Sequence, residues 1–319
     1  MKDKEREAAA FRAETERSFD AVRVAAPAAG GFALDLPSHV VAYLPAPGRK
    51  ARRNRRLVVT YDNLASMRER ARRMPWGNDF LAASGWDVLG VMVKVKDWFR
   101  HPALVAAMEG LRDEGFFAAF GAVSAFGASM GGFGALTFAG LYPGATILAF
   151  APQSTLDAAR APFERRYRYA QRTQPWAGAY ADAADGAAHA GRIYLAHDPR
   201  LPEDAAHAAR LAGPNVTSLA MPHLGHKLPP ALLRMGQLKP MAHAALSGTL
   251  ELPAFHQMMR ARLTSPAYLE SLLARAAAGG HHALALRAAD RLMAERPHWK
   301  IGRQRRGLRA AMEGFETED

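Results

Sequence analysis

The sequence predicts an α/β protein with a mainly parallel sheet, helices on both of its faces, and a C-terminal helical cap. Short apolar runs rich in β-branched residues alternate along the chain with segments of helical spacing. This alternation is typical of a parallel sheet buried on both sides. From about residue 229 the strand signal ends, and short helical segments follow one another between prolines and glycines.

Six apolar runs are expected to form the strands of the sheet. They lie at 57–61, 86–93, 123–126, 145–150, 192–197 and 216–221. Helical spacing predicts helices over 102–114 and 130–141. Near the start, residues 1–18 favour an amphipathic helix, and the alternating residues at 22–24 and 40–44 favour short strands.

The chain is expected to have three parts. Residues 1–35 would form an N-terminal helix and a lead-in strand, 36–250 the α/β domain, and 251–319 the C-terminal helical segment, docked on that domain. The stretch 155–190 interrupts the strand–helix alternation and is rich in arginine and aromatic residues. As an insertion between two strands, it is expected to cover the carboxyl edge of the sheet, where such folds bind ligands. The C-terminal helices are expected at 253–263, 265–278, 281–296 and 299–313.

Composition excludes several classes of protein. The 319 residues are 49% hydrophobic and 23% charged, as is ordinary for a chain that buries a sizeable core. The absence of cysteine excludes disulfides, thiolate metal sites and cysteine nucleophiles. No apolar run reaches the length of about 18 residues that a membrane-spanning helix needs. The first residues also lack the apolar stretch of a secretory signal, so we expect a cytoplasmic protein.

The net charge of +12 is not strong evidence for a nucleic-acid partner. Lysine accounts for only 8 of the 42 basic residues, and arginine and alanine are abundant throughout the chain. This indicates a coding bias and a generally basic, solvated surface. The sequence also lacks a nucleic-acid-binding motif and the interleaved aromatic residues that stack on bases. We therefore expect no nucleic-acid partner.

One motif carries chemical information: Gly127-Ala128-Ser129-Met130-Gly131, which has the form G-x-S-x-G. An expected strand precedes it and an expected helix follows it, and this context gives the short pattern its meaning. Small residues around Ser129 let the chain turn sharply and expose the hydroxyl beyond the sheet edge. The backbone N–H of Met130 would point into the same space at the positive end of the helix.

With this motif the chain resembles the α/β-hydrolase superfamily over about residues 36–250. The resemblance implies a serine nucleophile, an acid and a histidine in that chain order. Ser129 is the expected nucleophile, Asp198 at the end of the run 192–197 the expected acid, and His226 after the run 216–221 the expected base. Glu203 and Asp204 remain alternative acids, and His223 remains an alternative base.

The resemblance also implies a second backbone donor for an oxyanion hole, from the loop after the run 57–61. The residues there are Asn63 and Leu64, and either N–H would act together with that of Met130. The loop lacks the glycine-rich HGGG form. The basic stretch Arg68–Arg73 follows it, and two interpretations of this stretch stay open: a solvated helix face, or an entrance that binds an anionic or saccharide-like ligand.

The sequence therefore supports two hypotheses of function. The first is a serine hydrolase of the ester or acyl-transfer type that forms an acyl-enzyme on Ser129 and acts on a small-molecule or saccharide ester. The second is a catalytically silent scaffold that binds a partner or an anionic saccharide through its basic face and C-terminal helices. No cofactor is expected, and without cysteine or an HExxH pattern no metal is expected either. The oligomeric state stays open.

Overall fold

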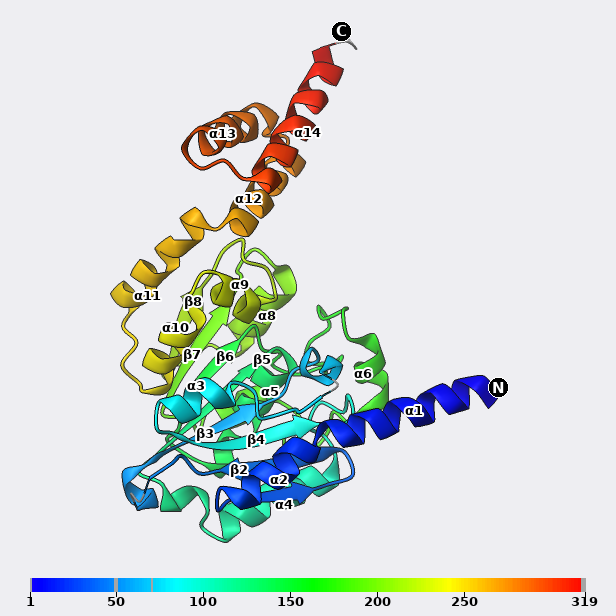
Figure 1. Ribbon diagram of the computed structural model, residues 1–319, viewed down its shortest axis with the longest axis vertical. Coiled ribbons are helices and arrows are strands. Elements are labelled where there is room, and N and C mark those ends of the chain that lie inside the picture. Colours follow the sequence, from blue (N-terminus) through cyan, green and yellow to red (C-terminus); the bar gives the residue numbers. More distant parts are fainter. Residues whose placement is uncertain (1, 49–50, 70, 317–319) are drawn as a thin grey trace.

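An eight-stranded sheet forms the centre of the computed structural model, which describes residues 2–48, 51–69 and 71–316 (Figure 1). The strand order is β1-β2-β4-β3-β5-β6-β7-β8. β2 pairs antiparallel with β1 and β4, and the remaining pairs are parallel. The strands are β1 Phe32–Asp35, β2 His39–Leu44, β3 Arg56–Tyr61, β4 Asp87–Val93, β5 Ala122–Ala128, β6 Thr146–Phe150, β7 Arg192–His197 and β8 Val216–Ala220. The predicted fold class is confirmed, and each of the six expected runs matches one of these strands to within two residues at either end.

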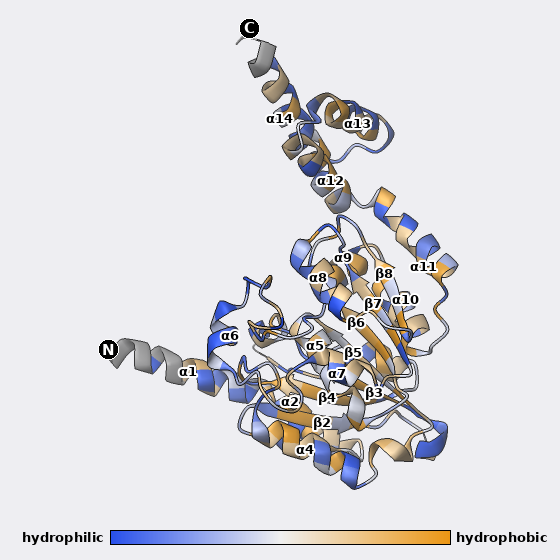
Figure 2. Cartoon of the chain, turned by 180° about the vertical axis from the view of Figure 1, so that it is seen from behind, coloured by the Kyte–Doolittle hydropathy of each residue, from blue (hydrophilic) through white to orange (hydrophobic). Residues whose placement is uncertain are grey.

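Both faces of the sheet are buried. Adjacent residues of one strand point to opposite faces, so Val59 packs into one apolar cluster and Val58 into the other. The first cluster includes residues of α4 and α5, and the second includes residues of α9, α10 and α11. In Figure 2 the apolar colour is concentrated on the central strands. A parallel sheet covered in this way brings the carboxyl ends of its strands to one edge, where loops can form a site.

Fourteen α-helices and five 3-10 helices lie within the described residues. The α-helices are α1 Lys2–Ser18, α2 Asp20–Ala28, α3 Asn78–Ala83, α4 Pro102–Asp113, α5 Met130–Thr137, α6 Arg168–Thr173, α7 Ala183–Ala187, α8 Pro202–Arg210, α9 Leu228–Arg234, α10 Leu238–Leu246, α11 Leu252–Met259, α12 Pro266–Ala278, α13 His282–Glu295 and α14 Trp299–Glu316. The 3-10 helices are η1 Arg52–Asn54, η2 Ser66–Arg68, η3 Phe117–Ala119, η4 Ala139–Leu141 and η5 Arg260–Thr264. The helix expected at 130–141 is divided, because α5 ends at Thr137 and η4 follows.

The strand predicted at 22–24 is wrong, because these residues lie in α2. Val22 and Ala26 are buried one helical turn apart, while Val24 is 70% exposed. A strand would place Val22 and Val24 on the same face, whereas a helix separates them. The apolar period of this segment is therefore helical.

The four predicted C-terminal helices are present. Phe255 and Met259 of α11 join the apolar cluster beneath α9 and α10, so α11 docks on the sheet domain. Helices α12–α14 pack around a cluster of their own, and Figures 1 and 2 show them extending beyond the sheet domain. In the part of the chain that the structure describes, no helix combines the length and apolar character needed to cross a bilayer.

Candidate active site

Ser129 lies at a sharp turn between β5 and α5. Its φ of 53° and ψ of −119° place a non-glycine residue in a costly region of backbone space. Close packing makes glycine necessary on both sides of this turn. A Cβ on Gly127 would lie 2.1 Å from the carbonyl oxygen of Gly131, and one on Gly131 would lie 2.4 Å from that of Tyr61. The turn therefore holds the Ser129 hydroxyl at the carboxyl edge of the sheet.

The structure brings Ser129, His226 and Asp204 together in a hydrogen-bonded chain. His226 Nε2 lies 3.0 Å from Ser129 Oγ. The other ring nitrogen, Nδ1, lies 2.9 Å from Asp204 Oδ2 and 3.0 Å from Oδ1. Ser129 comes from the β5–α5 turn, His226 from the loop before α9, and Asp204 from the first turn of α8. This nucleophile–base–acid geometry is the one that serine acyl transfer requires.

Asp198, the expected acid, makes no hydrogen bond to the ring of His226. Its Oδ2 accepts a hydrogen bond of 2.7 Å from the backbone N–H of Gly225, and its Oδ1 accepts one of 2.9 Å from that of Arg200. Asp198 therefore holds the loop that carries the histidine, while Asp204, an alternative acid in the sequence interpretation, faces the ring. Glu203, the other alternative, has no side-chain hydrogen bond or ion pair within the described residues.

Charged groups around Asp204 favour its ionised form. Burial opposes ionisation, but hydrogen bonds and charge from His226 and Arg166 hold the pKa of Asp204 below its ordinary value. Arg166 Nη1 lies 2.7 Å from Asp204 Oδ1, and Arg166 also pairs with Glu164. The carboxylate that faces the imidazole is thus fixed by an arginine from the 155–190 insertion.

His223, the alternative base, makes no hydrogen bond to Ser129 in the described part of the chain. Its backbone has a φ of 66°, and its Nδ1 lies 3.5 Å from Arg275 Nη1 of α12. In the described residues this arginine is its only side-chain partner.

The residues expected to supply oxyanion donors lie around the same space as Ser129. Asn63 and Leu64 line a cavity together with Ser129 and His226. Among the described residues, neither Met130 N–H nor Leu64 N–H has an acceptor. Asn63 N–H faces Ser66 Oγ at 3.4 Å, and the Asn63 side chain accepts from the amides of Ala65 and Ser66. Leu64 is therefore the better placed of the two.

The basic stretch Arg68–Arg73 divides into residues with different environments. Arg68 is exposed and lines the cavity, and Arg72 is exposed. Arg73 is buried, pairs with Asp62 and donates to the Val93 carbonyl, so it belongs to the core and not to an anion-binding entrance. Burial raises the pKa of Asp62 to about 6 against the opposing charge of Arg73. Arg70 lies outside the described residues.

The cavity at Ser129 has a volume of about 540 Å³, in the range of pockets that hold small molecules. Its apolar lining comes from two sides, the loop after β3 and the segment that contains α9 and the start of α10. The larger apolar residues are Leu64, Trp76, Pro229, Pro230, Leu233 and Leu238. Charged residues of both signs line it as well, namely Arg68, Glu69 and Lys227.

Two polar residues beside Ser129 were not predicted individually. Tyr167, from the insertion, has its hydroxyl 3.4 Å from both Ser129 Oγ and His226 Nε2. Gln153, after β6, accepts a hydrogen bond of 3.3 Å from Ser129 Oγ and is fully buried. In the sequence, only their positions pointed to the site. Gln153 follows the carboxyl end of a strand, and Tyr167 lies in the aromatic-rich insertion.

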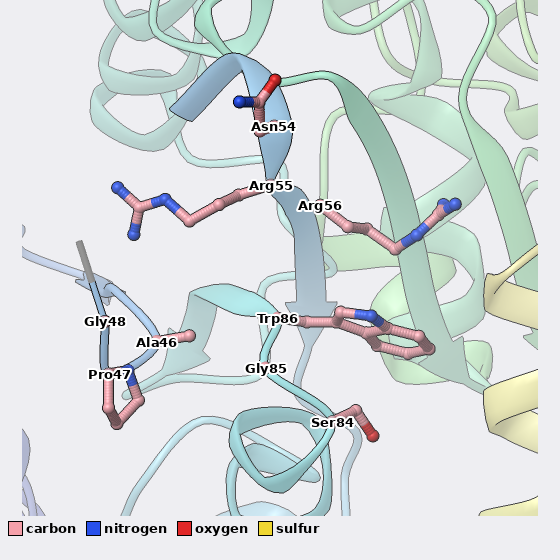
Figure 3. A pocket seen from close by; sticks show the side chains of 9 residues that line it. All are labelled: Ala46, Pro47, Gly48, Asn54, Arg55, Arg56, Ser84, Gly85 and Trp86. Carbon is pink, nitrogen blue, oxygen red and sulfur yellow. The ribbon is translucent and has the colours of Figure 1, made fainter. Parts of the chain in front are cut away.

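A second cavity, of about 440 Å³, lies at the opposite edge of the sheet, near the starts of β3 and β4 (Figure 3). Its two arginines point away from each other. Arg55 pairs with Asp87, and Arg56 donates to Ser124 Oγ and the Leu246 carbonyl. Because both guanidinium groups are used by the protein, this cavity does not present converging charges to a ligand.

The sheet order and the turn at Ser129 together define an α/β-hydrolase-like fold. No protein-family model matches the chain, and no curated protein matches it. Among solved structures it is similar to an acetyl ester-xyloside bifunctional hydrolase from Caldicellulosiruptor lactoaceticus (13% identity, TM-score 0.46, 66% of this chain and 90% of that one). It is also similar to an esterase from Pyrobaculum calidifontis (13% identity, TM-score 0.47, 76% of this chain and 94% of that one). A third similar structure is that of a capsule O-acetyltransferase of Neisseria meningitidis serogroup A (12% identity, TM-score 0.40, 67% of this chain and 94% of that one).

Proposed function

We propose that this protein is a serine hydrolase of the ester or acyl-transfer type, with Ser129 as nucleophile, His226 as base and Asp204 as acid. The observation that carries the proposal is the chain of contacts from Ser129 Oγ to His226 Nε2, and from His226 Nδ1 to Asp204. A serine hydroxyl attacks an ester efficiently only when a base accepts its proton. The strained turn at Ser129 supports the same role, because such strain is concentrated at functional sites.

The reaction divides into two steps. Ser129 Oγ attacks the acyl carbon while His226 Nε2 takes the hydroxyl proton, and the tetrahedral intermediate collapses as the alcohol leaves with that proton. Water or an acceptor alcohol then attacks the acyl-enzyme with His226 again as base. Asp204 holds the imidazole in the required tautomer and stabilises the imidazolium. The N–H groups of Met130 and Leu64 would donate to the oxyanion, each contributing about 3 kcal/mol to the transition state.

The cavity supports a small-molecule ester with an apolar part. Its walls are mainly apolar, and Arg68, Glu69 and Lys227 give its lining mixed charge. Burial of Arg73 removes one cation from the basic stretch at the entrance. An uncharged ester of modest size therefore suits this site better than a polyanionic saccharide.

Labelling with a fluorophosphonate probe tests the proposal. The wild-type protein should be labelled on Ser129 and should hydrolyse p-nitrophenyl esters. Ser129→Ala should abolish both, and His226→Ala should reduce both by several orders of magnitude. The control is His256→Ala, which changes an exposed histidine of α11. A folded wild type that is neither labelled nor active on esters would refute the proposal and favour the silent scaffold.

A further inference from the structure

Tyr167 occupies a position that the Ser129–His226–Asp204 mechanism does not use. Its hydroxyl is 3.4 Å from Ser129 Oγ and 3.4 Å from His226 Nε2, and those two atoms are 3.0 Å apart. In acyl transfer, the oxygen of the leaving alcohol must be bonded to the carbon on Oγ and must also receive a proton from Nε2. That oxygen therefore has to lie close to both atoms, and the Tyr167 hydroxyl is within 3.4 Å of each of them.

Neighbouring side chains pack against the ring of Tyr167, but its hydroxyl group makes no short hydrogen bond. The Trp98 ring packs edge-on against it at 5.0 Å, and the Arg166 guanidinium lies 5.5 Å from its centre. Within the described residues, Ser129 and His226 are the only hydrogen-bond partners of the hydroxyl. Both distances exceed the usual lengths of hydrogen bonds between a hydroxyl and an oxygen or a nitrogen, about 2.5–3.2 Å. The hydroxyl is thus positioned next to the reacting atoms without being committed to a strong bond.

The same hydroxyl is a donor at neutral pH. Burial raises the pKa of Tyr167 above its ordinary value, so the phenol stays protonated under ordinary assay conditions. A neutral phenol stabilises an oxygen that gains negative charge, as the leaving oxygen does when its bond to carbon breaks.

We propose that Tyr167 is a further catalytic residue that donates a hydrogen bond to the oxygen of the departing alcohol. The inference rests on the function proposed above. As the tetrahedral intermediate collapses, the bond between carbon and the leaving oxygen breaks, and its electron pair stays on that oxygen. His226 Nε2 delivers the proton to this oxygen, while Tyr167 keeps its own proton and only donates the hydrogen bond. By microscopic reversibility, Tyr167 then donates to the water or acceptor alcohol that enters at the same place.

This role makes the contribution of Tyr167 depend on the alcohol. An alkoxide leaving group carries a concentrated negative charge and needs a donor, whereas p-nitrophenolate spreads its charge over the ring and needs little help. The acyl group is then expected on the apolar side of the cavity formed by the loop after β3 and by α9. The alcohol is expected on the side of the 155–190 insertion.

The test compares Tyr167→Phe with the wild type on p-nitrophenyl butyrate and ethyl butyrate, which share one acyl group. We expect kcat/KM on the ethyl ester to fall by about 10- to 100-fold, the effect of one hydrogen bond to a charged oxygen. On the p-nitrophenyl ester it should stay within about threefold. The rate of fluorophosphonate labelling should also be preserved, because fluoride departs readily. The matched control is Tyr169→Phe, whose 71% exposed side chain lies two residues away, and which should change neither rate.

The outcomes separate this inference from the function on which it rests. An equal loss on both esters would overturn the inference, because a purely structural role does not distinguish between leaving groups. An unchanged rate on both esters would also overturn it, while leaving the serine-hydrolase proposal intact. A wild type that hydrolyses neither ester and is not labelled would overturn both.

Discussion

His226 Nδ1 lies 2.9 Å from Asp204 Oδ2, while Asp198, six residues earlier, bonds to the backbone N–H of Gly225 at 2.7 Å. One carboxylate therefore orients the imidazole ring, and the other holds the loop on which the ring is carried. Substitution of the two aspartates is therefore expected to have different effects on catalysis.

Asp204→Asn should reduce kcat by about 10⁴-fold with little change in the fold, because an amide facing Nδ1 stabilises the wrong tautomer and cannot balance the imidazolium. Asp198→Asn keeps an oxygen that can accept from Gly225 or Arg200, so its effect on kcat should stay within about tenfold. Kinetics on p-nitrophenyl butyrate measure both variants. The reverse ranking would contradict the assignment and would restore Asp198 as the acid.

Arg166→Gln should make the enzyme more sensitive to acid. Arg166 and His226 hold the pKa of Asp204 below its ordinary value against the effect of burial, so loss of Arg166 should raise that pKa. Asp204 would then protonate at a higher pH, and a protonated carboxyl cannot stabilise the imidazolium. The acid limb of the kcat/KM profile should therefore move to higher pH, while the rate at pH 8, where Asp204 is ionised in both proteins, should stay within about threefold of the wild type.

The control for this variant is Arg165→Gln, the exposed neighbour of Arg166. Its pH profile should overlay that of the wild type. If Arg166→Gln lowered activity by the same factor at every pH, Arg166 would act through the shape of the insertion and not through the charge of Asp204.

The parts of the site encoded over short distances were predictable from the sequence. The turn at Ser129 needs a strand, small residues and a helix within one segment, and all three are visible in the sequence. The acid was harder to assign because Asp198 and Asp204 follow the same strand. Which carboxylate reaches the ring depends on how α8 packs against β7, and no local pattern encodes that distance.

Contacts between residues far apart in the sequence explain the other differences between the sequence predictions and the structure. Arg73 belongs to a basic run that is typical of a solvated face, yet it pairs with Asp62 and lies over the ring of Phe19 at 4.4 Å. Tyr167 reaches Ser129 across 38 positions, from a segment without regular periodicity. Contacts of this kind depend on the tertiary fold, so composition and spacing cannot reveal them.

Gly131→Ala should inactivate the protein. A Cβ at this position would lie 2.4 Å from the Tyr61 carbonyl oxygen and 2.8 Å from that of Asp62, so α5 and the turn at Ser129 would have to shift. Displacement of a nucleophile by about 1 Å costs on the order of 100-fold in rate, and overpacking costs about 1–3 kcal/mol of stability. Ester kinetics and urea unfolding measure the two effects.

The matched control is Gly110→Ala in α4, where an added Cβ meets no atom within 4 Å. Alanine is the better helix former by about 1 kcal/mol, so this variant should be slightly more stable and equally active. An active Gly131→Ala protein would show that the close approach of α5 to β3 is not required.

Removal of residues 265–319 should leave an active protein. Helices α12–α14 pack around their own buried residues, among them Leu273 and Ile301, whereas α11 is retained because Phe255 and Met259 are buried with the sheet domain. The chain 1–264 keeps the full site and should hydrolyse p-nitrophenyl butyrate within about threefold of the wild-type rate. Loss of activity in a folded 1–264 chain would assign a catalytic role to the C-terminal segment.

A buried pair, His39 and Asp97, sets opposing effects of pH on stability. Burial lowers the pKa of His39 to about 3 and raises that of Asp97 to about 7. Between pH 6.5 and 3 the unfolded chain holds a proton on His39 that the folded protein does not. Through this group the free energy of unfolding therefore decreases as the pH falls. Between pH 7 and 3.8 the folded protein holds a proton on Asp97 that the unfolded chain does not. Through this group the free energy of unfolding therefore increases as the pH falls.

Asp97→Asn should remove the second effect and expose the first. The unfolding free energy of the variant should then fall more steeply with acidification than that of the wild type, by about 1.4 kcal/mol per pH unit between pH 6.5 and 4. Urea unfolding at half-unit steps of pH measures the two slopes, and Asp185→Asn, at an exposed position, should leave the slope unchanged. Parallel curves for Asp97→Asn and the wild type would contradict this prediction, because they would mean that Asp97 takes up no proton on folding in this range.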